Sequence, residues 1–203
     1  MARGEIATDQ DATRLAALIS RAAPAGKGIP PVERWHPSFR SELDIEIRAD
    51  GAWFYMGTPI RREALVRLFS TVLRKDQDDR TYLVTPAEKV AIRVEDAPFI
   101  AVEMSADLLG GDQVLTFRTN VGDVVEAGSS HPLRFEMEGE KGAFKPYLHV
   151  RGRLEALVSR AVTFDLAELG ETRTIDGTAM FCIASGGAVF PIMPAQRLRA
   201  LSQ

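Results

Sequence analysis

Residues 43–56 constrain the fold more than any other stretch of the chain. Apolar residues alternate with polar ones from Leu43 to Ile47, and a second apolar run, 53–56, follows shortly after Asp50-Gly51. A period of two is typical of a strand that buries one face, and Asp-Gly is a preferred turn between two paired strands. These residues therefore predict an antiparallel β-hairpin that turns one face to a core.

The sequence around this hairpin predicts two helices and two further strands. A helix is expected at residues 8–22, followed by a linker or ordered loop rich in proline and glycine. A second helix is expected to begin at Thr58-Pro59, because threonine caps helices and proline suits their first turn, and to end near Arg74. With strands at 82–85 and 89–94, the segment 41–95 is expected to form strand, strand, helix, strand, strand.

The remainder of the chain, beyond the break at Asp96-Ala97-Pro98, predicts a β-rich domain. The expected domains are 1–30 (helix and linker), 31–97 (α+β) and 98–203 (β-rich). The expected elements of the last domain are strands at 99–104, 113–119, 124–127, 133–138 and 144–151, a helix within 154–169, and a final strand pair, 178–184 and 188–192, joined at Ser185-Gly186-Gly187. A hairpin connection is expected at 120–123, between the strands 113–119 and 124–127.

One tetrapeptide suggests an internal duplication. Glu63–Val66 and Glu155–Val158 are both Glu-Ala-Leu-Val, and each is expected in a helix that follows a strand. The alternative is coincidence, since Glu, Ala and Leu are common in helices. We therefore expect an α+β fold of two mainly antiparallel lobes with a duplicated strand-strand-helix-strand-strand pattern, in which 41–95 and 133–192 superpose.

Composition excludes several classes of protein. With 203 residues, 45% of them apolar, the chain should bury about 70% of its unfolded surface and needs no disulfide. The single cysteine, Cys182, lies in an apolar run and is expected to be buried rather than a reactive thiol. A net charge of −3, no secretory signal and no long apolar run predict a soluble cytoplasmic protein without a membrane span or nucleic-acid partner.

Sequence motifs for catalysis and for cofactors are missing. The chain has no glycine-rich dinucleotide loop, phosphate loop, nucleophile elbow or zinc-binding HExxH helix. Its three histidines are far apart. Asp76, Asp78 and Asp79 lack the remaining positions of a calcium loop and are expected in a solvated loop. We predict no catalytic residue, cofactor or metal, although an enzyme whose acid and base come from distant segments stays an alternative.

Three groups of residues could instead bind an anion. Arg61 and Arg62 are expected in the first turn of a helix, where free N–H groups favour anions, unless both extend into solvent. Alternating residues from Lys145 to Arg153 form one basic face of a strand, which could equally be an ordinary solvated face. The turn Thr85–Lys89 could border a pocket or be a plain turn.

Trp35 and Trp53 could each stack on a base. For Trp53, which is expected within a strand, packing in the core is the alternative interpretation. The expected ligand-binding residues are Trp35, Arg61, Arg62, Thr85, Glu88, Lys89, Lys145, His149 and Arg151. The residues expected in the core are Ile45, Trp53, Leu65, Phe69, Val84, Ile92, Phe99, Phe117, Leu157 and Phe181.

Several short runs resemble the bacterial Domain of Unknown Function 1285 family. The runs are 35–37, 44–47, 50–55, 57–62, 68–69, 82–89 and 94–99, with a looser match beyond residue 110. The resemblance implies two domains with an internal duplication, a C-terminal domain superficially like pleckstrin-homology folds, and a ligand site between the domains. It also implies a nucleotide-like ligand and a role in signalling, and it supplies no catalytic residues.

Together these observations predict a ligand-binding or sensory protein. We expect it to recognise a small anionic, nucleotide-like molecule in a cleft between the two domains, with a role in signal transduction. A protein-interaction adaptor and an enzyme of unrecognised mechanism are the alternatives.

Overall fold

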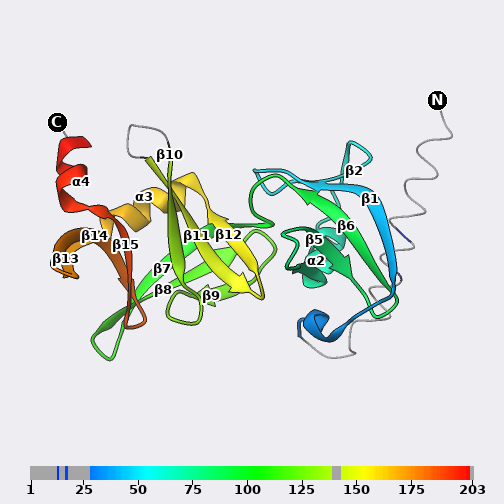
Figure 1. Cartoon of the computed structure of the whole chain (residues 1–203), viewed down its shortest axis with the longest axis horizontal. Helices are drawn as coiled ribbons and strands as arrows, with labels where there is room; N and C mark the ends of the chain where they lie inside the picture. Colours follow the sequence, from blue (N-terminus) through cyan, green and yellow to red (C-terminus); the bar gives the residue numbers. More distant parts are fainter. Residues whose placement is uncertain (1–12, 14–16, 18–27, 139–142, 202–203) are drawn as a thin grey trace. The chain divides into compact units, whose positions relative to one another are not determined.

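The computed structural model describes residues 13, 17, 28–138 and 143–201 (Figure 1). The chain divides into two compact units, 1–98 with 152–154, and 99–151 with 155–203. Each unit contains a six-stranded sheet, and the second also has a sheet of three strands. The expected helix at 8–22 lies outside the described residues, apart from Thr13 and Ala17, which are both helical.

The first sheet has the strand order β3-β2-β1-β6-β5-β4. All its neighbours are antiparallel except β1 and β6, which run parallel. The predicted hairpin is confirmed, with Ile45 opposite Tyr55 and Ile47 opposite Trp53. The elements of this unit are η1 (Val32–Arg34), β1 (Phe39–Ile47), β2 (Trp53–Tyr55), β3 (Thr58–Pro59), α2 (Glu63–Thr71), β4 (Leu73–Lys75), β5 (Thr81–Val84) and β6 (Glu88–Val94).

Helix α2 packs on one face of this sheet. Phe69 of the helix is fully buried, and its ring centroid lies 6.1 Å from that of Trp53, which is also buried. Ile45 and Ile47 turn to the same face of β1 and are fully buried. The alternating polar residues of β1 therefore turn to the opposite face, away from α2.

The predicted start of the second helix is wrong. Thr58 pairs with Tyr55 and Pro59 with Phe54, so both residues form β3. The turn between the strands has positive φ at Met56 and Gly57, the geometry of a tight hairpin, and strand pairing therefore takes up the residues that locally favour a helix start. Proline is tolerated in β3 because this strand is at the sheet edge. The helix begins only at Glu63, after the extended residue Arg62.

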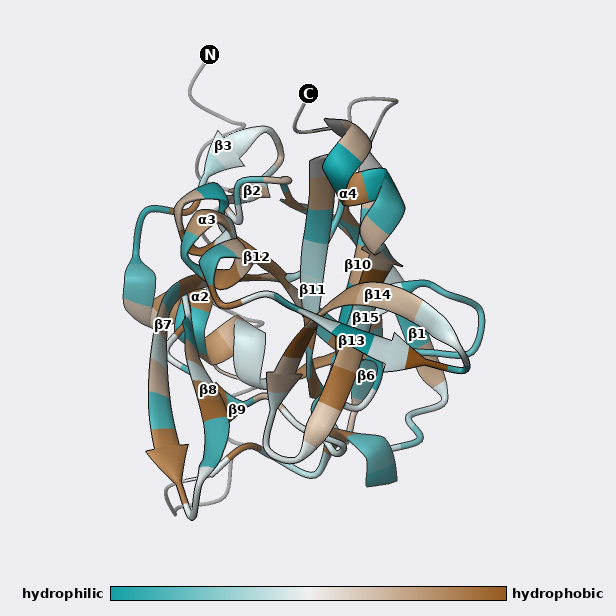
Figure 2. Cartoon of the chain, turned by 90° about the vertical axis from the view of Figure 1, so that its left-hand side faces the viewer, coloured by the Kyte–Doolittle hydropathy of each residue, from teal (hydrophilic) through white to brown (hydrophobic). Residues whose placement is uncertain are grey.

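The second unit contains a six-stranded sheet of order β10-β11-β12-β7-β8-β9 and a three-stranded sheet, β13-β14-β15. Figure 2 shows apolar and polar bands along β8, and in this strand the alternate residues Leu115, Phe117 and Thr119 are buried, as expected for a strand with one buried face. The predicted strands are confirmed, whereas β13 and α4 were not predicted. The elements are β7 (Phe99–Leu109), β8 (Asp112–Thr119), β9 (Val124–Glu126), β10 (Leu133–Glu138), β11 (Ala143–Arg151), β12 (Leu154–Val158), α3 (Arg160–Glu168), β13 (Glu171–Ile175), β14 (Thr178–Ser185), β15 (Ala188–Pro194) and α4 (Ala195–Leu201).

The predicted helix within 154–169 is only partly correct. Residues 154–158 form strand β12, with Leu154, Ala156 and Val158 buried in alternation. Helix α3 follows, and the Ser159 hydroxyl caps it by accepting a hydrogen bond from the Val162 N–H. Glu-Ala-Leu-Val is therefore helical in α2 and extended in β12, so the predicted superposition of 41–95 on 133–192 is wrong in its residue correspondence.

The repetition lies in the strand order. Each six-stranded sheet consists of two meanders of three consecutive strands. The first strand of the earlier meander pairs in parallel with the last strand of the later one, so that β1 pairs with β6 and β7 with β12. The repeated segments are thus 39–94 and 99–158. The α+β class with two mainly antiparallel lobes is confirmed, while the pleckstrin-homology likeness stays a prediction.

Burial follows the sequence expectation closely. Of the ten expected core residues, eight are buried, and Leu65 and Leu157 are half-buried. Cys182 is fully buried, and this burial raises the pKa of its thiol, as expected for an inert cysteine. Among the described residues no helix has the length and apolar character needed to cross a membrane.

Candidate functional site

The face of the first sheet that α2 leaves uncovered is highly charged. Every second residue of β1 turns away from the helix, and these residues are one base followed by three acids, Arg40, Glu42, Asp44 and Glu46. Arg80 donates a hydrogen bond to Glu42 at 2.6 Å, and Arg93 donates one to Asp44 at 3.1 Å. These ion pairs are exposed and contribute little to stability, so this part of the face is an ordinary solvent-exposed charged surface.

One end of this face is covered by the segment around η1. Trp35 packs against a buried cluster that contains Tyr82, Val84 and Ala91. Arg74 holds the segment in place, since its Nη1 donates hydrogen bonds to the carbonyl oxygens of Val32 at 2.7 Å and Trp35 at 2.8 Å. A charged side chain thus lies beneath a covering loop.

Arg74, Asp76 and Lys89 form a largely buried ion cluster beside this segment. The Arg74 and Lys89 side chains are each 8% exposed, and both donate to the Asp76 carboxylate, Arg74 through Nε at 2.6 Å. The Lys89 Nζ also lies 3.7 Å from the ring centroid of Tyr82. Burial alone would raise the pKa of the Asp76 carboxyl, but the hydrogen bonds and charges of Arg74 and Lys89 outweigh it and hold the pKa below its ordinary value.

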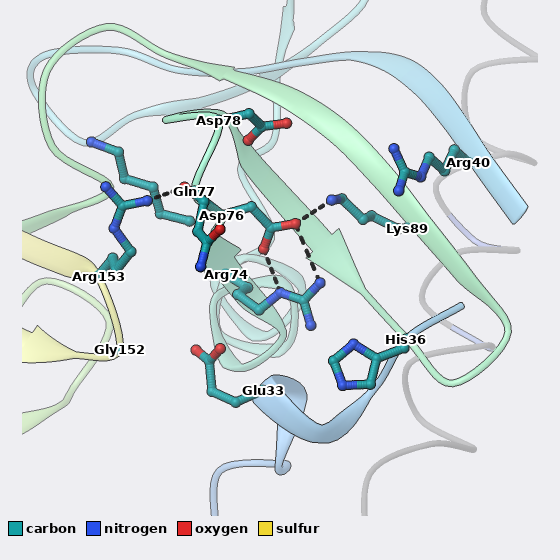
Figure 3. A pocket seen from close by; sticks show the side chains of 11 residues that line it. Glu33, His36, Arg40, Arg74, Asp76, Gln77, Asp78, Lys89, Gly152 and Arg153 are labelled. Atoms are coloured by element: carbon teal, nitrogen blue, oxygen red, sulfur yellow. Dashed lines mark hydrogen bonds and ion pairs between the residues drawn. The ribbon is translucent and has the colours of Figure 1, made fainter. Parts of the chain in front are cut away.

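A pocket of about 500 Å³ opens beside this cluster (Figure 3). Figure 3 shows Arg40 and Lys89 on neighbouring strands, and these residues are register partners in the parallel pair β1 and β6. Arg40 has no ion-pair partner within the part of the chain that the structure describes. The lining residues are Glu33, His36, Arg40, Arg74, Lys75, Asp76, Gln77, Asp78, Lys89, Gly152 and Arg153, the last two belonging to the first unit by their contacts.

The described lining of this pocket offers no hydroxyl or thiol nucleophile. It contains no serine, threonine or cysteine, and of its two lysines Lys89 pairs with Asp76 and Lys75 with Asp79. Asp78 accepts a hydrogen bond from the Tyr82 hydroxyl at 2.6 Å, which lowers the pKa of this carboxyl. Within the described residues, no group of three or more His, Cys, Asp or Glu side chains is placed to hold a metal ion.

The structure brings two of the predicted binding residues to this place. Lys89 lines the pocket, and Trp35 covers the same end of the sheet. Thr85 is fully buried, and its hydroxyl oxygen accepts hydrogen bonds from the N–H groups of Ala87 and Glu88. Thr85 therefore stabilises the turn in which it lies. Glu88 is buried in the strand that follows.

Arg61 and Arg62 are exposed and do not line this pocket. Both precede the first helical residue, Glu63, so the predicted position in the first turn of a helix is wrong. The prediction of an anion site at this helix start required both arginines in the first helical turn, and the structure does not place them there.

The basic face of β11 is largely engaged within the second unit. Tyr147 is buried, with the Arg134 guanidinium 4.0 Å from its ring centroid, and His149 stacks on His131 at 5.6 Å. Arg151 donates a hydrogen bond to Asp123 at 2.8 Å and is half-buried. Lys145 is also half-buried and has an interaction partner. These side chains line neither of the two pockets described, whereas Arg153, the last residue of the predicted basic face, lines the pocket beside Lys89.

Sequence reasoning missed Arg40, Arg74 and Asp76. Arg74 was expected at a helix end, and Asp76 was expected in a solvated loop. The alternation that predicted β1 extends back to Arg40, and this signal could have placed Arg40 on the polar face. No local pattern indicates that Arg40 and Lys89 are neighbours, since they lie on parallel strands far apart in sequence.

Family models cover both units. A model described as "Domain of unknown function (DUF1285), N-terminal domain" matches residues 30–97, and one described as "Protein of unknown function (DUF1285), C-terminal domain" matches residues 98–192. A comparison with curated proteins found no match.

Two solved structures are similar to this chain. A DUF1285 family protein from Silicibacter pomeroyi DSS-3 is 45% identical with a TM-score of 0.80, over 91% of this chain and 97% of that one. A DUF1285 family protein from Shewanella baltica OS155 is 26% identical with a TM-score of 0.49, over 62% of this chain and 91% of that one. With both family models matched in order along its length, this chain belongs to the DUF1285 family.

Proposed function

We propose that this protein is a ligand-binding protein whose pocket beside Lys89 binds a small anion. The observation that carries the proposal is that Arg74 and Lys89 share one carboxylate, Asp76, and that Arg40 lies in register beside Lys89. Buried charges are unfavourable unless they are compensated, and the buried cations Arg74 and Lys89 share a single carboxylate, while Arg40 adds an exposed positive charge beside them. A bound anion would compensate it.

The size and donors of the pocket support the same proposal. A volume of about 500 Å³ is in the range of sites for small organic ligands. Lys89 has three N–H donors, of which Asp76 accepts one, and Arg40 has five donors on an exposed guanidinium. A nucleotide-like ligand and a sensory or signalling role, which the family resemblance implies, are part of this proposal. A site between the two domains stays a prediction.

A protein-interaction adaptor is the second candidate function. Leu108 and Leu109, near the tip of the β7–β8 hairpin, are 78% and 60% exposed. Exposed large apolar side chains occur on protein-binding surfaces, and these two, as consecutive strand residues, point to opposite faces of the hairpin. An enzyme is less well supported, because the described pocket lining offers no hydroxyl or thiol nucleophile.

Thermal unfolding of the full chain with a panel of nucleotides and simpler anions tests the proposal. A ligand at about 100 times its dissociation constant should add about 2.7 kcal/mol of stability, visible as a raised Tm. Arg40→Gln should abolish most of this shift, because Arg40 has exposed and unused donors and its loss leaves the core intact. Arg61→Gln is the matched control, since Arg61 is also exposed but lies outside the pocket lining.

Two results would count against anion binding at this pocket. One is the absence of a Tm shift with every anion tested. The other is an Arg40→Gln variant that responds to ligand as strongly as the Arg61→Gln control does.

A further inference from the structure

We propose that the pocket beside Lys89 selects a doubly charged anion, with a phosphate monoester as its ligand class, and that Asp76 is the residue that sets this selectivity. The inference rests on the proposed function, because it requires that the pocket bind an anion. It adds the charge and chemical class of the ligand.

The balance of charge around the pocket carries the first step. Arg40, Arg74 and Lys89 are three cations, and Asp76 is the one carboxylate among them. The other charged residues of the lining are two cations and two carboxylates, which balance each other. They are Glu33, Lys75, Asp78 and Arg153. Two positive charges are left among the lining residues. Asp79, which pairs with Lys75 and Arg153 from outside the lining, is 72% exposed, so water screens much of its charge. One dianion neutralises this surplus more fully than one carboxylate ligand does.

The hydrogen bonds of Arg74 carry the second step. Its Nη1 donates to two backbone carbonyl groups, and its Nε and Nη2 both donate to Asp76. Arg74 is therefore engaged in holding the covering segment and the carboxylate in place. The donors that a ligand can reach belong to Arg40 and Lys89.

Arg40 and Lys89 are placed to share one tetrahedral anion. They are paired in register on parallel strands, which lie about 4.8 Å apart. A planar guanidinium can donate to two phosphate oxygens at once, and an ammonium group can donate to a third. A planar carboxylate has two oxygens and one negative charge, so it cannot offer separate oxygens to both donors of the guanidinium and to the ammonium group.

Asp76 limits how much negative charge the pocket accepts. Its carboxylate lies between Arg74 and Lys89 and already forms an ion pair with the Nζ of Lys89. Removing its charge leaves three cations around the pocket instead of a net two. Asp76→Asn should therefore bind sulfate and phosphate monoesters more tightly than the wild type, an effect that a merely structural role of Asp76 does not produce.

Calorimetric titration of the full chain at low ionic strength tests the ligand class. The probes are phenyl phosphate, inorganic phosphate, sulfate and benzoate, so that charge and the organic group vary separately. Phenyl phosphate should bind about tenfold more tightly than benzoate, since each charge-assisted hydrogen bond adds to affinity. Inorganic phosphate should bind more weakly than phenyl phosphate, because the pocket is large enough for an organic group.

The pH dependence separates phosphate from sulfate. A phosphate monoester gains its second charge with a pKa of about 6, so its affinity should rise between about pH 5 and about pH 7.5. Sulfate is fully ionised throughout and should show no such rise. This comparison is made in a His36→Gln variant, which removes the histidine from the pocket lining.

Arg40→Gln provides a test that does not depend on a buried residue. It leaves the pocket with one net charge, so the preference for phenyl phosphate over benzoate should fall from about tenfold to about twofold. Arg61→Gln should leave this preference unchanged, since Arg61 is exposed and outside the pocket.

The possible outcomes distinguish this inference from the proposed function. If no probe binds, the proposed function fails. If benzoate binds as tightly as phenyl phosphate, anion binding stands but selection of a dianion is wrong. If inorganic phosphate binds and phenyl phosphate does not, the monoester class is wrong. If a folded Asp76→Asn variant binds sulfate more weakly than the wild type, the role of Asp76 is wrong.

Discussion

Replacing Asp76 by asparagine tests whether the ion cluster is a coupled, buried unit or a set of surface contacts. The change keeps the size of the side chain and removes only its charge. It leaves Arg74 and Lys89, each 8% exposed, without the carboxylate to which both donate. The expected result is a large loss in the free energy of unfolding, in the absence of added anions.

The magnitude follows from what stays unpaired. Breaking a buried ion pair by removing one partner destabilises a protein by about 3–5 kcal/mol. The Asp76 side chain is 19% exposed, so water compensates part of this loss, and the asparagine oxygen still accepts one hydrogen bond worth about 0.5–1.5 kcal/mol. We therefore expect Asp76→Asn to lower the free energy of unfolding by about 2–4 kcal/mol.

Urea unfolding followed by tryptophan fluorescence is the assay of choice. Both tryptophans of the chain, Trp35 and Trp53, belong to the first unit, so the signal reports the unit that contains the cluster. Asp44→Asn is the matched control on the same face of the sheet, because the ion pair between Asp44 and Arg93 is exposed. Its loss should lower the free energy of unfolding by less than about 1 kcal/mol.

Equal stabilities of the two variants would refute the reasoning, since Asp76 would then behave like a surface acid. A second variant identifies the cause of the loss. Adding Lys89→Met to Asp76→Asn removes one of the uncompensated cations, so the double variant should regain part of the lost stability. If it is less stable than Asp76→Asn, unpaired charge is not what destabilises the single variant.

Three further predictions concern stability. Phe69→Ala should lower the free energy of unfolding by about 3–5 kcal/mol, because Phe69 is fully buried against Trp53, and a loss below about 1 kcal/mol in urea would contradict this packing. Ser159→Ala should lower stability by about 1 kcal/mol through the lost cap of α3, measured by circular dichroism, and no change would mean that this cap is unimportant. The folded pKa of Asp76 lies below its ordinary value of 3.8, so its stabilisation is present above that pH and is lost as the pH falls through the folded pKa. The stability difference between the wild type and Asp76→Asn should therefore shrink in acid, and a difference that persists under those conditions would contradict the linkage.

Local patterns were sufficient to predict the strands and most of the core. The hairpin at 43–56 follows from alternation and from a turn that only a few dipeptides favour, so its register needs no distant contact. The connection at 120–123 predicted the antiparallel pairing of β8 and β9 for the same reason. Where the signal lies within one turn and its two strands, the sequence was informative.

Tertiary contacts overrode local signals at two helices. Thr58-Pro59 has the composition of a helix start, but pairing with β2 takes these residues into the sheet. Glu155–Val158 has the composition of a helix, but it lies between β11 and β7, where alternate residues are buried on one face. The same four residues are helical at 63–66, so their own propensity is too weak to decide.

The candidate site depends on such distant contacts. Lys89 was predicted as a binding residue and lines the pocket, but its neighbours Arg40 and Asp76 come from other elements. The parallel pairing of β1 with β6 joins the first strand of the unit to its last one, a contact that no turn between them indicates. Charge alone could not identify the site, because basic residues occur along the whole chain.

Comparison of the two parallel strand pairs shows that the residues, and not the strand order, make the site. In the first sheet the parallel pair brings Arg40 beside Lys89. In the second sheet the parallel pair sets Phe99 opposite Ala156, and both are fully buried. The same topology thus holds cations in one unit and part of the apolar core in the other. A fold does not by itself determine a function, so anion binding is expected of the first unit alone, and charge-removing substitutions at exposed arginines of the second unit should leave it unchanged.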